Sequence, residues 1–537
     1  MIVSLFPALQ NPALSAERIF VNYSLFGRSI SIRALEIYAR EGKLTGELVS
    51  YARFVKPKQL AQLREGLLQK IEFSPVSLSQ FLYSSTGQII LGRGSQIIQT
   101  PVSQGSFSAL RSALILAAND PEGFTPLSIL RHYPSPEIVV NVREIVAIAN
   151  ETNRLFKQTA AFVKEIQSVP IGSPLSVSDA TRLRDWQKSG PFKWQKTTLT
   201  LQDSSPKRLN YTQRVRNFVA DVYVPETDRP QPAVVISHGL NSDRQSYIYL
   251  AEHLASYGFA AIVPEHPGSN KQQIQSLLEG RGSDVAQPME FLDRPLDVQF
   301  VLDTLQSLSQ TDPRFQGKLD LEQVGIIGQS FGGYTSLAMA GAPINFDGLR
   351  KSCGRLSKTL NISLVLQCQD PERDLYLNTL LPDSRIKAAI AINPITSAVL
   401  GPTSLAQIQI PTLMVSGSDD VIAPAWFEQI QPYAALAAPQ RRFVMIQNSN
   451  HFSTIARSTS EAESLPQIKG LEGPTPEVAQ NYVKVLSLVF MQAYLRGQQT
   501  DQKFLSPAGA AILSKPTLPL SIVQTLPEKT LPEKSSK

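Results

Sequence analysis

Ser330 is the serine whose surroundings best suit nucleophilic chemistry. It lies in the run Gly328-Gln-Ser-Phe-Gly-Gly333, which places a glycine two residues before it and another two residues after it. The apolar residues 324–327 predict a strand and the residues 334–340 predict a helix, so Ser330 is expected in the tight turn between them. Such a turn crowds the backbone, which requires small flanking residues, and it holds the serine Oγ at the carboxyl edge of a sheet. A glycine-rich turn without chemistry is the alternative interpretation.

A serine hydroxyl at its ordinary pKa is a weak nucleophile and needs a base beside it, most often a histidine. The chain has five histidines: His132, His238, His253, His266 and His451. If the chain order is nucleophile, acid and then base, His451 is the candidate that follows Ser330. It lies in the polar run Asn448-Ser-Asn-His451, where a loop would present the imidazole at the sheet edge. A structural surface histidine is the alternative.

A carboxylate must hold the base in the correct tautomer and stabilise its protonated form. The run Gly417-Ser-Asp-Asp-Val-Ile-Ala-Pro424 follows a predicted strand at 412–416 and supplies two aspartates. Asp420 is the expected acid, because a glycine three residues before it and a proline four residues after it are typical of the acid turn in many hydrolases. Asp419, otherwise a solvated neighbour, is the alternative.

The oxyanion of an acyl-transfer reaction needs preorganised backbone N–H donors, each worth about 3 kcal/mol of transition-state stabilisation. The N–H of Phe331, directly after the serine, is one expected donor. The N–H of Leu240 is the other, in the run Ser237-His-Gly-Leu-Asn241, where a glycine permits close approach of the backbone. In this loop we interpret His238 as a structural turn residue rather than a second base. We interpret His266 as a structural or site-wall residue.

The residues that follow 193 alternate between short apolar runs and amphipathic runs, as expected for strands joined by helices. Strands are predicted at 218–224, 233–237, 260–264, 324–328, 386–392, 412–416 and 442–446, and helices at 247–257, 296–308 and 478–495. Short, continuously apolar strands separated by helices indicate an α/β fold with a mostly parallel sheet covered on both faces. Such a sheet would bring the candidate residues to one edge, because each follows a predicted strand.

Residues 1–170 are predicted to form a mainly helical accessory domain. Apolar residues recur three and four positions apart in the runs 34–40, 44–55, 59–70, 107–118 and 142–166. A linker over 171–192, which begins with a Pro, Gly and Ser-rich stretch, leads to the catalytic domain over 193–503. Within that domain, an insertion over about 341–383 is expected to form a cap that lines the acyl pocket.

The end of the chain is predicted in two parts. Residues 504–524 are apolar enough to dock on the catalytic domain. Residues 525–537 include a repeated Thr-Leu-Pro-Glu-Lys and are expected to form a disordered tail, because such a segment buries little apolar surface.

The composition is that of a folded protein, with 42% hydrophobic and 18% charged residues in a chain of 537. Nothing approaches the roughly 18 apolar residues of a membrane-spanning helix. The net charge is +6, and residues 1–195 hold 21 Lys and Arg against 14 Asp and Glu, a balance of +7 that leaves −1 for the remainder. The basic excess therefore belongs to the accessory domain and gives no clue to the substrate.

Two cysteines, Cys353 and Cys368, exclude a multi-thiolate metal cluster. Two buried free thiols are the favoured interpretation, and one disulfide, which needs an oxidising compartment, is the alternative. The apolar start of the chain, 1–16, lacks a basic segment and is broken by Pro7, so it is a poor signal peptide or a truncated one. The compartment, cytoplasm or periplasm, and the oligomeric state stay open.

Residues from about 195 to 500 resemble an α/β-hydrolase. The runs Val235-Ile-Ser-His-Gly-Leu240, Leu254-Ala-Ser-Tyr-Gly-Phe259 and Pro264-Glu-His266, together with the serine turn, resemble plasma-type platelet-activating-factor acetylhydrolases. The resemblance implies Ser330 as nucleophile, His451 as base, and the amides of Leu240 and Phe331 as oxyanion hole. That family carries its acid one strand earlier, where this chain has Asn393, so the acid is expected from the next strand, as in dienelactone-hydrolase-like enzymes.

The first 170 residues resemble a helical domain of unknown function that precedes α/β-hydrolases in photosynthetic bacteria. The runs Glu17-Arg-Ile-Phe-Val21, Ser29-Ile-Ser-Ile32 and Arg111-Ser-Ala-Leu-Ile-Leu-Ala-Ala118 carry this likeness, which implies no activity. The domain is interpreted as a lid over the acyl pocket, a docking module for anionic lipid or a partner, or a scaffold. Its charge is spread rather than clustered, which favours scaffold or lid over docking.

These observations predict a serine carboxylic-ester hydrolase, esterase or lipase-like, that forms an acyl-enzyme on Ser330 and acts on a small-molecule or lipid ester. A short or oxidised acyl group, carried on a phospholipid for example, follows from the resemblance alone. An acyltransferase or peptidase on the same triad, and a non-catalytic binding module, are the alternatives. No metal or organic cofactor is expected, because histidines are few and no glycine-rich phosphate loop is present. No nucleic-acid partner is expected either. Peripheral membrane association is left open.

Overall fold

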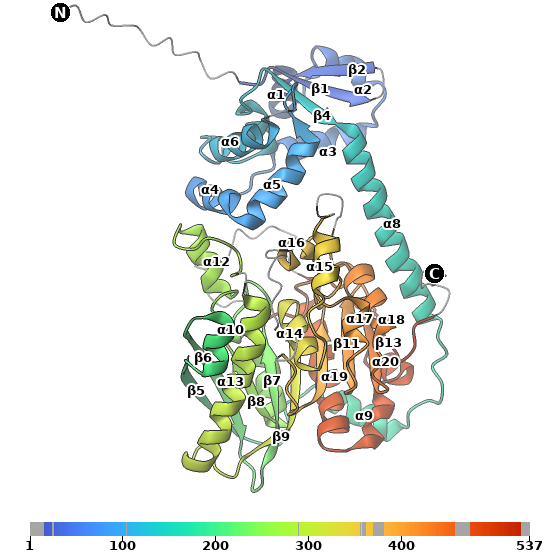
Figure 1. Cartoon of the computed structure of the whole chain (residues 1–537). Helices are drawn as coiled ribbons and strands as arrows, with labels where there is room; N and C mark the ends of the chain where they lie inside the picture. Colours follow the sequence, from blue (N-terminus) through green and yellow to red (C-terminus); the bar gives the residue numbers. More distant parts are fainter. Residues whose placement is uncertain are drawn as a thin grey trace, which may run out of the picture. The chain divides into compact units, whose positions relative to one another are not determined.

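The computed structural model describes residues 15–23, 26–72, 74–103, 105–287, 289–354, 356, 361–368, 381–456 and 473–527. The chain divides into two compact units (Figure 1). The N-terminal unit comprises Met1–Glu151 and Ser276–Asp284, and the C-terminal unit comprises Thr152–Gln275 and Val285–Lys537. The division falls inside helix α8 (Val142–Gln167) rather than at residue 170, because Phe162 and Ile166 of that helix belong to the core of the C-terminal unit.

A sheet of nine strands, counted within the described residues, forms the centre of the C-terminal unit. Its order is β13-β12-β11-β10-β9-β7-β8-β6-β5. The strands are β5 (Trp194–Asp203), β6 (Arg216–Pro225), β7 (Gln231–Ser237), β8 (Ala260–Pro264), β9 (Leu319–Gln329), β10 (Ile386–Ile392), β11 (Thr412–Gly417), β12 (Arg441–Ile446) and β13 (Leu520–Val523). Neighbours from β8 to β12 in this order pair in parallel, whereas β5, β6 and β13 join by antiparallel pairing. The predicted strands, β6 to β12, are confirmed.

Alternate residues of each central strand face two different hydrophobic cores. In β7, Val235 belongs to one core and Val234 to the other. Helices α13 (Glu290–Thr311) and α14 (Phe331–Met339) contribute to the first core, and α11 (Ile248–Ser256) and α19 (Pro476–Leu495) to the second (Figure 1). Burial on both faces explains why the sequence of these strands is continuously apolar.

Both edges of the sheet carry strands that the sequence analysis does not predict. In β5 the residues alternate between exposed and buried along most of the strand, as expected where one face of an edge strand is open. At the other edge, residues 504–524 form α20 (Pro507–Leu513) and β13, and β13 pairs with β12. The predicted linker 171–192 contains helix α9 (Val177–Asp185). Residues 528–537 of the predicted tail lie outside the described part of the chain.

Shorter helical segments connect these elements. They are α10 (Pro206–Thr212), α12 (Lys271–Leu278), α15 (Phe346–Cys353), α16 (Ser363–Gln367), α17 (Gly401–Leu405), α18 (Gln431–Ala435), the 3₁₀ helices η1 (Arg244–Tyr247) and η4 (Gln499–Phe504), and the π-helix η3 (Trp426–Ile430). The predicted cap, 341–383, is described only in part, as α15 and α16. The structure joins Cys353 and Cys368 in a disulfide, so the favoured expectation of two free thiols is wrong.

The N-terminal unit combines the predicted helices with a sheet that was not predicted. Its helices are α1 (Ile32–Glu41), α2 (Glu47–Ala52), α3 (Pro57–Leu68), α4 (Pro75–Tyr83), α5 (Ser85–Ile97), α6 (Ser106–Ala118) and α7 (Pro126–Arg131). Its sheet has the order β2-β1-β4-β3, from β1 (Arg18–Tyr23), β2 (Phe26–Ser31), β3 (Ile98–Gln99) and β4 (Glu137–Asn141). The pairing of β1 with β4 joins residues far apart in the sequence, which local patterns do not reveal.

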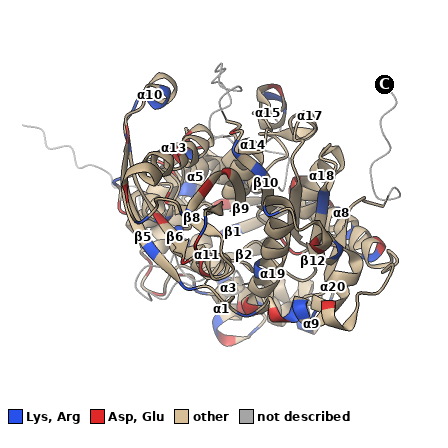
Figure 2. Cartoon of the chain, turned by 90° about the horizontal axis from the view of Figure 1, so that it is seen from below, with Lys and Arg blue, Asp and Glu red and all other residues tan. Residues whose placement is uncertain are grey.

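Charged residues of both signs are interspersed along the elements in Figure 2, in keeping with the spread of charge in the sequence. Among the described residues, no helix is both long enough and apolar enough to cross a membrane.

Candidate active site

Ser330 lies at the sharp turn between β9 and α14, as predicted. Its backbone has φ 56° and ψ −114°, a strained conformation for a residue with a side chain. A Cβ added to Gly328 would lie 1.9 Å from the carbonyl oxygen of Gly332, and one added to Gly332 would lie 2.0 Å from that of Ser237. Only glycine fits at either position, so the spacing around Ser330 follows from backbone crowding.

His451 and Asp420 meet at the carboxyl ends of neighbouring strands. Nδ1 of His451 lies 2.7 Å from Oδ2 of Asp420. The other oxygen, Oδ1, accepts the backbone N–H groups of Ile422 at 2.9 Å and Ala423 at 2.7 Å. The carboxylate is therefore fixed in place, and its bond to Nδ1 assigns the imidazole proton to that nitrogen and a lone pair to Nε2.

Asp419, the alternative acid, does not share this position. Its side chain is exposed, and its Oδ1 accepts the hydroxyl of Ser418 at 2.6 Å. Asp420 is buried, with 4% of its surface exposed. The geometry therefore favours Asp420 as the partner of His451.

The residue before the serine ties the base to the nucleophile turn. Gln329 is buried, and its Nε2 donates to the backbone carbonyl of His451 at 3.2 Å. A Cβ added to Gly239 would lie 2.3 Å from Oε1 of the same side chain. Gln329 thus touches both the base loop and the loop after β7. Its place inside the serine motif was the one sequence signal for this role.

The two predicted oxyanion donors lie on segments that approach each other closely. Phe331 is fully buried at the first position of α14, and Leu240, partly exposed, lies in the loop after β7. The contact of Gly332 with the Ser237 carbonyl brings that loop against the nucleophile turn. The structure therefore brings together the segments that carry Ser330, His451, Asp420 and both donors.

His238 occupies the turn position predicted for it. The backbone N–H of His266 donates to its Nε2 at 3.1 Å, and its Nδ1 lies 2.8 Å from the carbonyl of Gly239. Both ring nitrogens are therefore engaged, and burial lowers the pKa of His238. A neutral imidazole with two backbone partners acts as a brace of the loop.

His266 belongs to a second Ser–His–Asp arrangement that sequence reasoning missed. Its Nε2 lies 3.0 Å from Oγ of Ser237, and its Nδ1 lies 3.0 Å from Oδ2 of Asp297. All three residues have no exposed surface. Burial, followed by the charges of nearby arginines, first Arg294, lowers the pKa of His266.

Comparison with known proteins agrees with the fold. Residues 232–349 match a family model described as alpha/beta hydrolase fold. This stretch contains β7, β8, β9 and the serine turn. The C-terminal unit therefore has the α/β-hydrolase fold. A second model, described as alpha/beta hydrolase of unknown function, matches residues 15–141, which lie in the N-terminal unit.

Two curated relatives share about a quarter of the aligned residues with this chain. An esterase-named protein, YitV of Bacillus subtilis (strain 168), is 23% identical over 233 residues, which cover 42% of this chain and 84% of that protein. The platelet-activating factor acetylhydrolase of Cavia porcellus is 23% identical over 308 residues, which cover 50% of this chain and 59% of that protein.

Asn393 follows β10, the strand after which the resembling acetylhydrolases carry their acid. Its backbone has φ 42°, and its Oδ1 accepts the N–H of Gly417 at 2.9 Å. Gly417 ends β11 and opens the loop that carries Asp420. The asparagine therefore holds the neighbouring loop that carries Asp420.

The described part of the cap is anchored to the acid loop. The N–H of Ser363 in α16 donates to the carbonyl of Ile422 at 2.9 Å. The buried carboxylate of Glu428 accepts from Ser363 at 2.9 Å and from Gln367 at 3.1 Å. These bonds place α16 beside the loop of Asp420.

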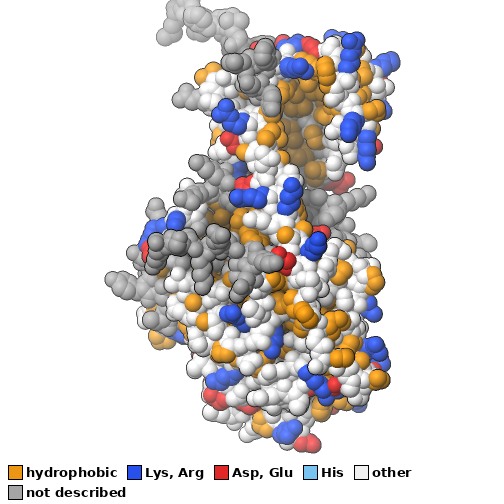
Figure 3. Space-filling view, turned by 90° about the vertical axis from the view of Figure 1, so that its right-hand side faces the viewer, with side chains coloured by type: hydrophobic (Ala, Val, Ile, Leu, Met, Phe, Trp, Pro, Cys, Tyr) orange, Lys and Arg blue, Asp and Glu red, His pale blue; other side chains and the backbone are white. Residues whose placement is uncertain are grey.

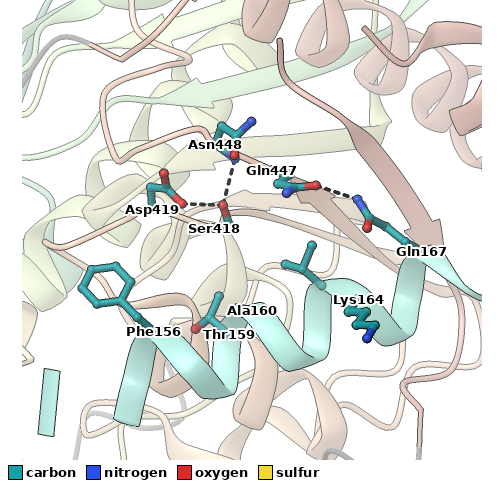
Figure 4. Close-up of a pocket in the computed structure, with 10 residues that line it drawn as sticks. Phe156, Thr159, Ala160, Lys164, Gln167, Ser418, Asp419, Gln447 and Asn448 are labelled. Atoms are coloured by element: carbon teal, nitrogen blue, oxygen red, sulfur yellow. Dashed lines mark hydrogen bonds between the residues drawn. The ribbon is translucent and has the colours of Figure 1, made fainter. Parts of the chain in front are cut away.

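A pocket of about 310 Å³ lies between α8 and the loops that follow β11 and β12 (Figure 4). Figure 4 shows Gln167 of α8 bonded to Gln447, at 2.6 Å, and Ser418 bonded to both Asp419 and Asn448. The pocket is lined by Phe156, Thr159, Ala160, Val163, Lys164, Gln167, Ser418, Asp419, Gln447 and Asn448. Gln447 and Asn448 lead into the loop of His451, so the bond of Gln167 ties α8 to that loop.

Proposed function

We propose that this protein is a serine carboxylic-ester hydrolase. The observation that carries the proposal is the bond of His451 to Asp420, tied through Gln329 to a strained Ser330 turn. The match of residues 232–349 to the alpha/beta hydrolase fold and the esterase name of one relative support it.

The proposed reaction has two halves. Nε2 of His451 takes the hydroxyl proton as Ser330 Oγ attacks the ester carbonyl, and the resulting oxyanion accepts hydrogen bonds from the N–H groups of Phe331 and Leu240. When the carbonyl re-forms, the C–O bond to the alcohol breaks, and His451 returns the proton to that alcohol. Water then repeats the sequence on the acyl-Ser330 ester and releases the acid. Asp420 stabilises the imidazolium in both halves.

We further propose that the acyl group is short or oxidised and that phospholipids are among the substrates. This proposal is supported by the similarity to a Cavia porcellus protein that is named platelet-activating factor acetylhydrolase. A series of p-nitrophenyl esters and short-chain phospholipids of increasing acyl length tests this point. We expect turnover to fall steeply beyond short acyl chains.

Labelling with a fluorophosphonate tests the reaction itself. The full-length protein should lose esterase activity as one equivalent of the probe attaches, and peptide mapping should place the adduct on Ser330. Heat-denatured protein is the control and should not react. Folded protein that resists the probe and does not hydrolyse p-nitrophenyl butyrate would contradict the proposal and favour a binding module. Preferential acyl transfer to added alcohols or amines would replace hydrolysis with an acyltransferase activity.

A further inference from the structure

Arg294 is a fully buried cation on α13 that touches both halves of the proposed oxyanion hole. Its Nη1 donates to the carbonyl of His238 at 2.5 Å, and its Nη2 to that of Gly239 at 3.4 Å. On the other side, its guanidinium carbon lies 4.3 Å from the centre of the Phe331 ring, a cation–π contact. One side chain therefore contacts the loop after β7 and the first residue of α14.

These bonds fix the direction of the neighbouring amides. In a trans peptide the N–H points opposite to the carbonyl of the same unit. The carbonyl of Gly239 and the N–H of Leu240 belong to one peptide unit, so a carbonyl held toward Arg294 turns the Leu240 N–H away from it. His238 Nδ1 holds the same carbonyl at 2.8 Å. The orientation of the proposed donor thus depends on Arg294 and His238.

Ionic and polar contacts keep the guanidinium in place. Its Nε donates to Oγ of Ser269 at 2.8 Å and lies 3.6 Å from Oε2 of Glu290, one turn earlier on α13. Burial lowers the pKa of Arg294 to about 10, which leaves it charged at neutral pH. A fixed positive charge behind the carbonyls also polarises the peptide units whose N–H groups face the nucleophile side.

We propose that Arg294 is a positioning residue that aligns the Leu240 amide toward the oxyanion, strengthens it as a donor and packs against the ring of Phe331. The proposal rests on the proposed function, since an oxyanion hole has a role only if an oxyanion forms.

The test compares Arg294→Met and Arg294→Lys with the matched variant Arg208→Met in the full-length protein. Arg208 is equally buried, but its bonds run to Asp203, Asp293 and Asp297. Arg294→Met should lower kcat about 10²- to 10³-fold, the loss expected for one oxyanion donor, with little change in KM. Arg294→Lys should recover part of the loss, because it keeps the charge. Arg208→Met should lower thermal stability while folded protein keeps most of its kcat.

Inhibitor binding separates alignment from general damage. A trifluoromethyl ketone forms a tetrahedral oxyanion on the serine, whereas the matching methyl ketone binds without forming one. Arg294→Met should weaken the first by the same factor as kcat/KM and leave the second unchanged. Equal losses for both ketones, equal losses of kcat in Arg208→Met, or a kcat within threefold of the parent would overturn the proposal. Full activity of Ser330→Ala would instead overturn the proposed function.

A second and independent observation concerns the connection between α2 and α3 in the N-terminal unit. The side chains from Arg53 to Lys58 are exposed without interruption, and Phe54 is 79% exposed. Arg53, Lys56 and Lys58 supply three cations here, and residues 48–64 contain no Asp or Glu. The guanidinium of Arg28 also lies over the ring of Phe54, 5.8 Å from its centre.

An exposed aromatic ring among unopposed cations suits the interface of an anionic bilayer, where the ring enters the headgroup region and the cations meet lipid phosphates. Figure 3 shows hydrophobic and basic side chains close together on the surface of this unit. We propose that this connection, residues 53–58, binds an anionic membrane surface.

Co-sedimentation of the full-length protein with vesicles tests this proposal. Binding should require phosphatidylglycerol in the phosphatidylcholine vesicles and should weaken as salt rises, because screening shortens the reach of the charges. Phe54→Ser and the double variant Lys56→Glu, Lys58→Glu should each reduce binding at least threefold. Val177→Ala and Lys188→Glu, which alter exposed residues of the C-terminal unit, are controls that should not. Equal binding to vesicles without phosphatidylglycerol, no binding, or equal losses in the controls would overturn it.

Discussion

The molecule contains two sets of a serine, a histidine and an aspartate, and in each set the histidine bonds the aspartate through Nδ1. In the proposed catalytic set, Nδ1 of His451 lies 2.7 Å from Asp420. In the second set, Nδ1 of His266 lies 3.0 Å from Asp297, and Nε2 lies 3.0 Å from the hydroxyl of Ser237. The two serines follow or end neighbouring strands, since Ser237 in β7 pairs with Gly328 in β9. The histidine–aspartate distances alone do not separate the two sets.

The two sets differ in backbone and in access to solvent. Ser237 is the last residue of a strand, whereas Ser330 has a positive φ that projects it from the turn. Ser330 retains 5% of its surface exposed, whereas Ser237, like its two partners, retains none. A substrate can reach only a hydroxyl that meets solvent, so the strained turn has a direct chemical consequence.

The two carboxylates also differ in what already neutralises them. Asp297 accepts from Arg208 at 2.6 Å and from Arg216 at 3.1 Å, in addition to His266. Asp420 instead accepts from His451 and from the uncharged backbone N–H groups of Ile422 and Ala423. A carboxylate paired with two arginines has little charge left to stabilise an imidazolium. The buried set therefore holds a neutral histidine.

Replacing each serine by alanine gives the largest contrast between the sets. Ser330→Ala should lower kcat on p-nitrophenyl butyrate on the order of 10⁶-fold, as loss of a nucleophile does in other serine hydrolases. Ser237→Ala should leave kcat within about tenfold, because it removes one buried hydrogen bond. Initial rates at saturating ester measure both. A Ser237 variant as inactive as the Ser330 variant, with its fold intact by circular dichroism, would reverse the assignment.

The two neighbouring aspartates sharpen the comparison at the acid. Asp420→Asn should lower kcat about 10³- to 10⁴-fold, because an amide does not hold the imidazole proton on Nδ1 in the same way and cannot stabilise the imidazolium. Asp419→Asn is the matched control and should change kcat less than threefold, since Asp419 bonds to Ser418. Steady-state rates across pH measure both variants. Similar losses in the two would mean that the acid is not Asp420 alone.

The two sets also differ in how much of each can be predicted from the sequence. The turn at Ser330 and the pairing of His451 with Asp420 can be predicted from local patterns. Glycine spacing and the residues that directly follow a strand are both visible in a short run of sequence. The buried ion network of Arg208, Asp293 and Asp297 cannot be predicted in this way, because charged residues are ordinarily solvated. Its burial depends on packing between segments distant in the sequence. The pairing of β1 with β4 escaped prediction for the same reason.

A smaller effect follows from the buried histidines, which should make the protein less stable in acid. Burial lowers the pKa of His238 and His266, and that of His253 to about 3. In the unfolded chain these histidines have a pKa of about 6.5. Below that pH the unfolded chain binds protons that the native protein does not bind, so the free energy of unfolding falls as pH falls. Each such histidine contributes up to about 1.4 kcal/mol per pH unit until its native pKa is reached.

Denaturant unfolding at pH 7.5, 6.0 and 5.0 measures this slope, with His253→Leu as the variant, because Nε2 of His253 is buried without a hydrogen-bond partner. In the variant, the free energy of unfolding should depend less steeply on pH, by the contribution of one histidine. Its kcat should not change, because His253 lies on α11 and outside both sets. An NMR titration should meanwhile show the His266 ring uncharged down to pH 5. A His266 ring that takes up a proton near pH 6.5 would remove the electrostatic difference between the sets, leaving solvent access and backbone strain to separate them.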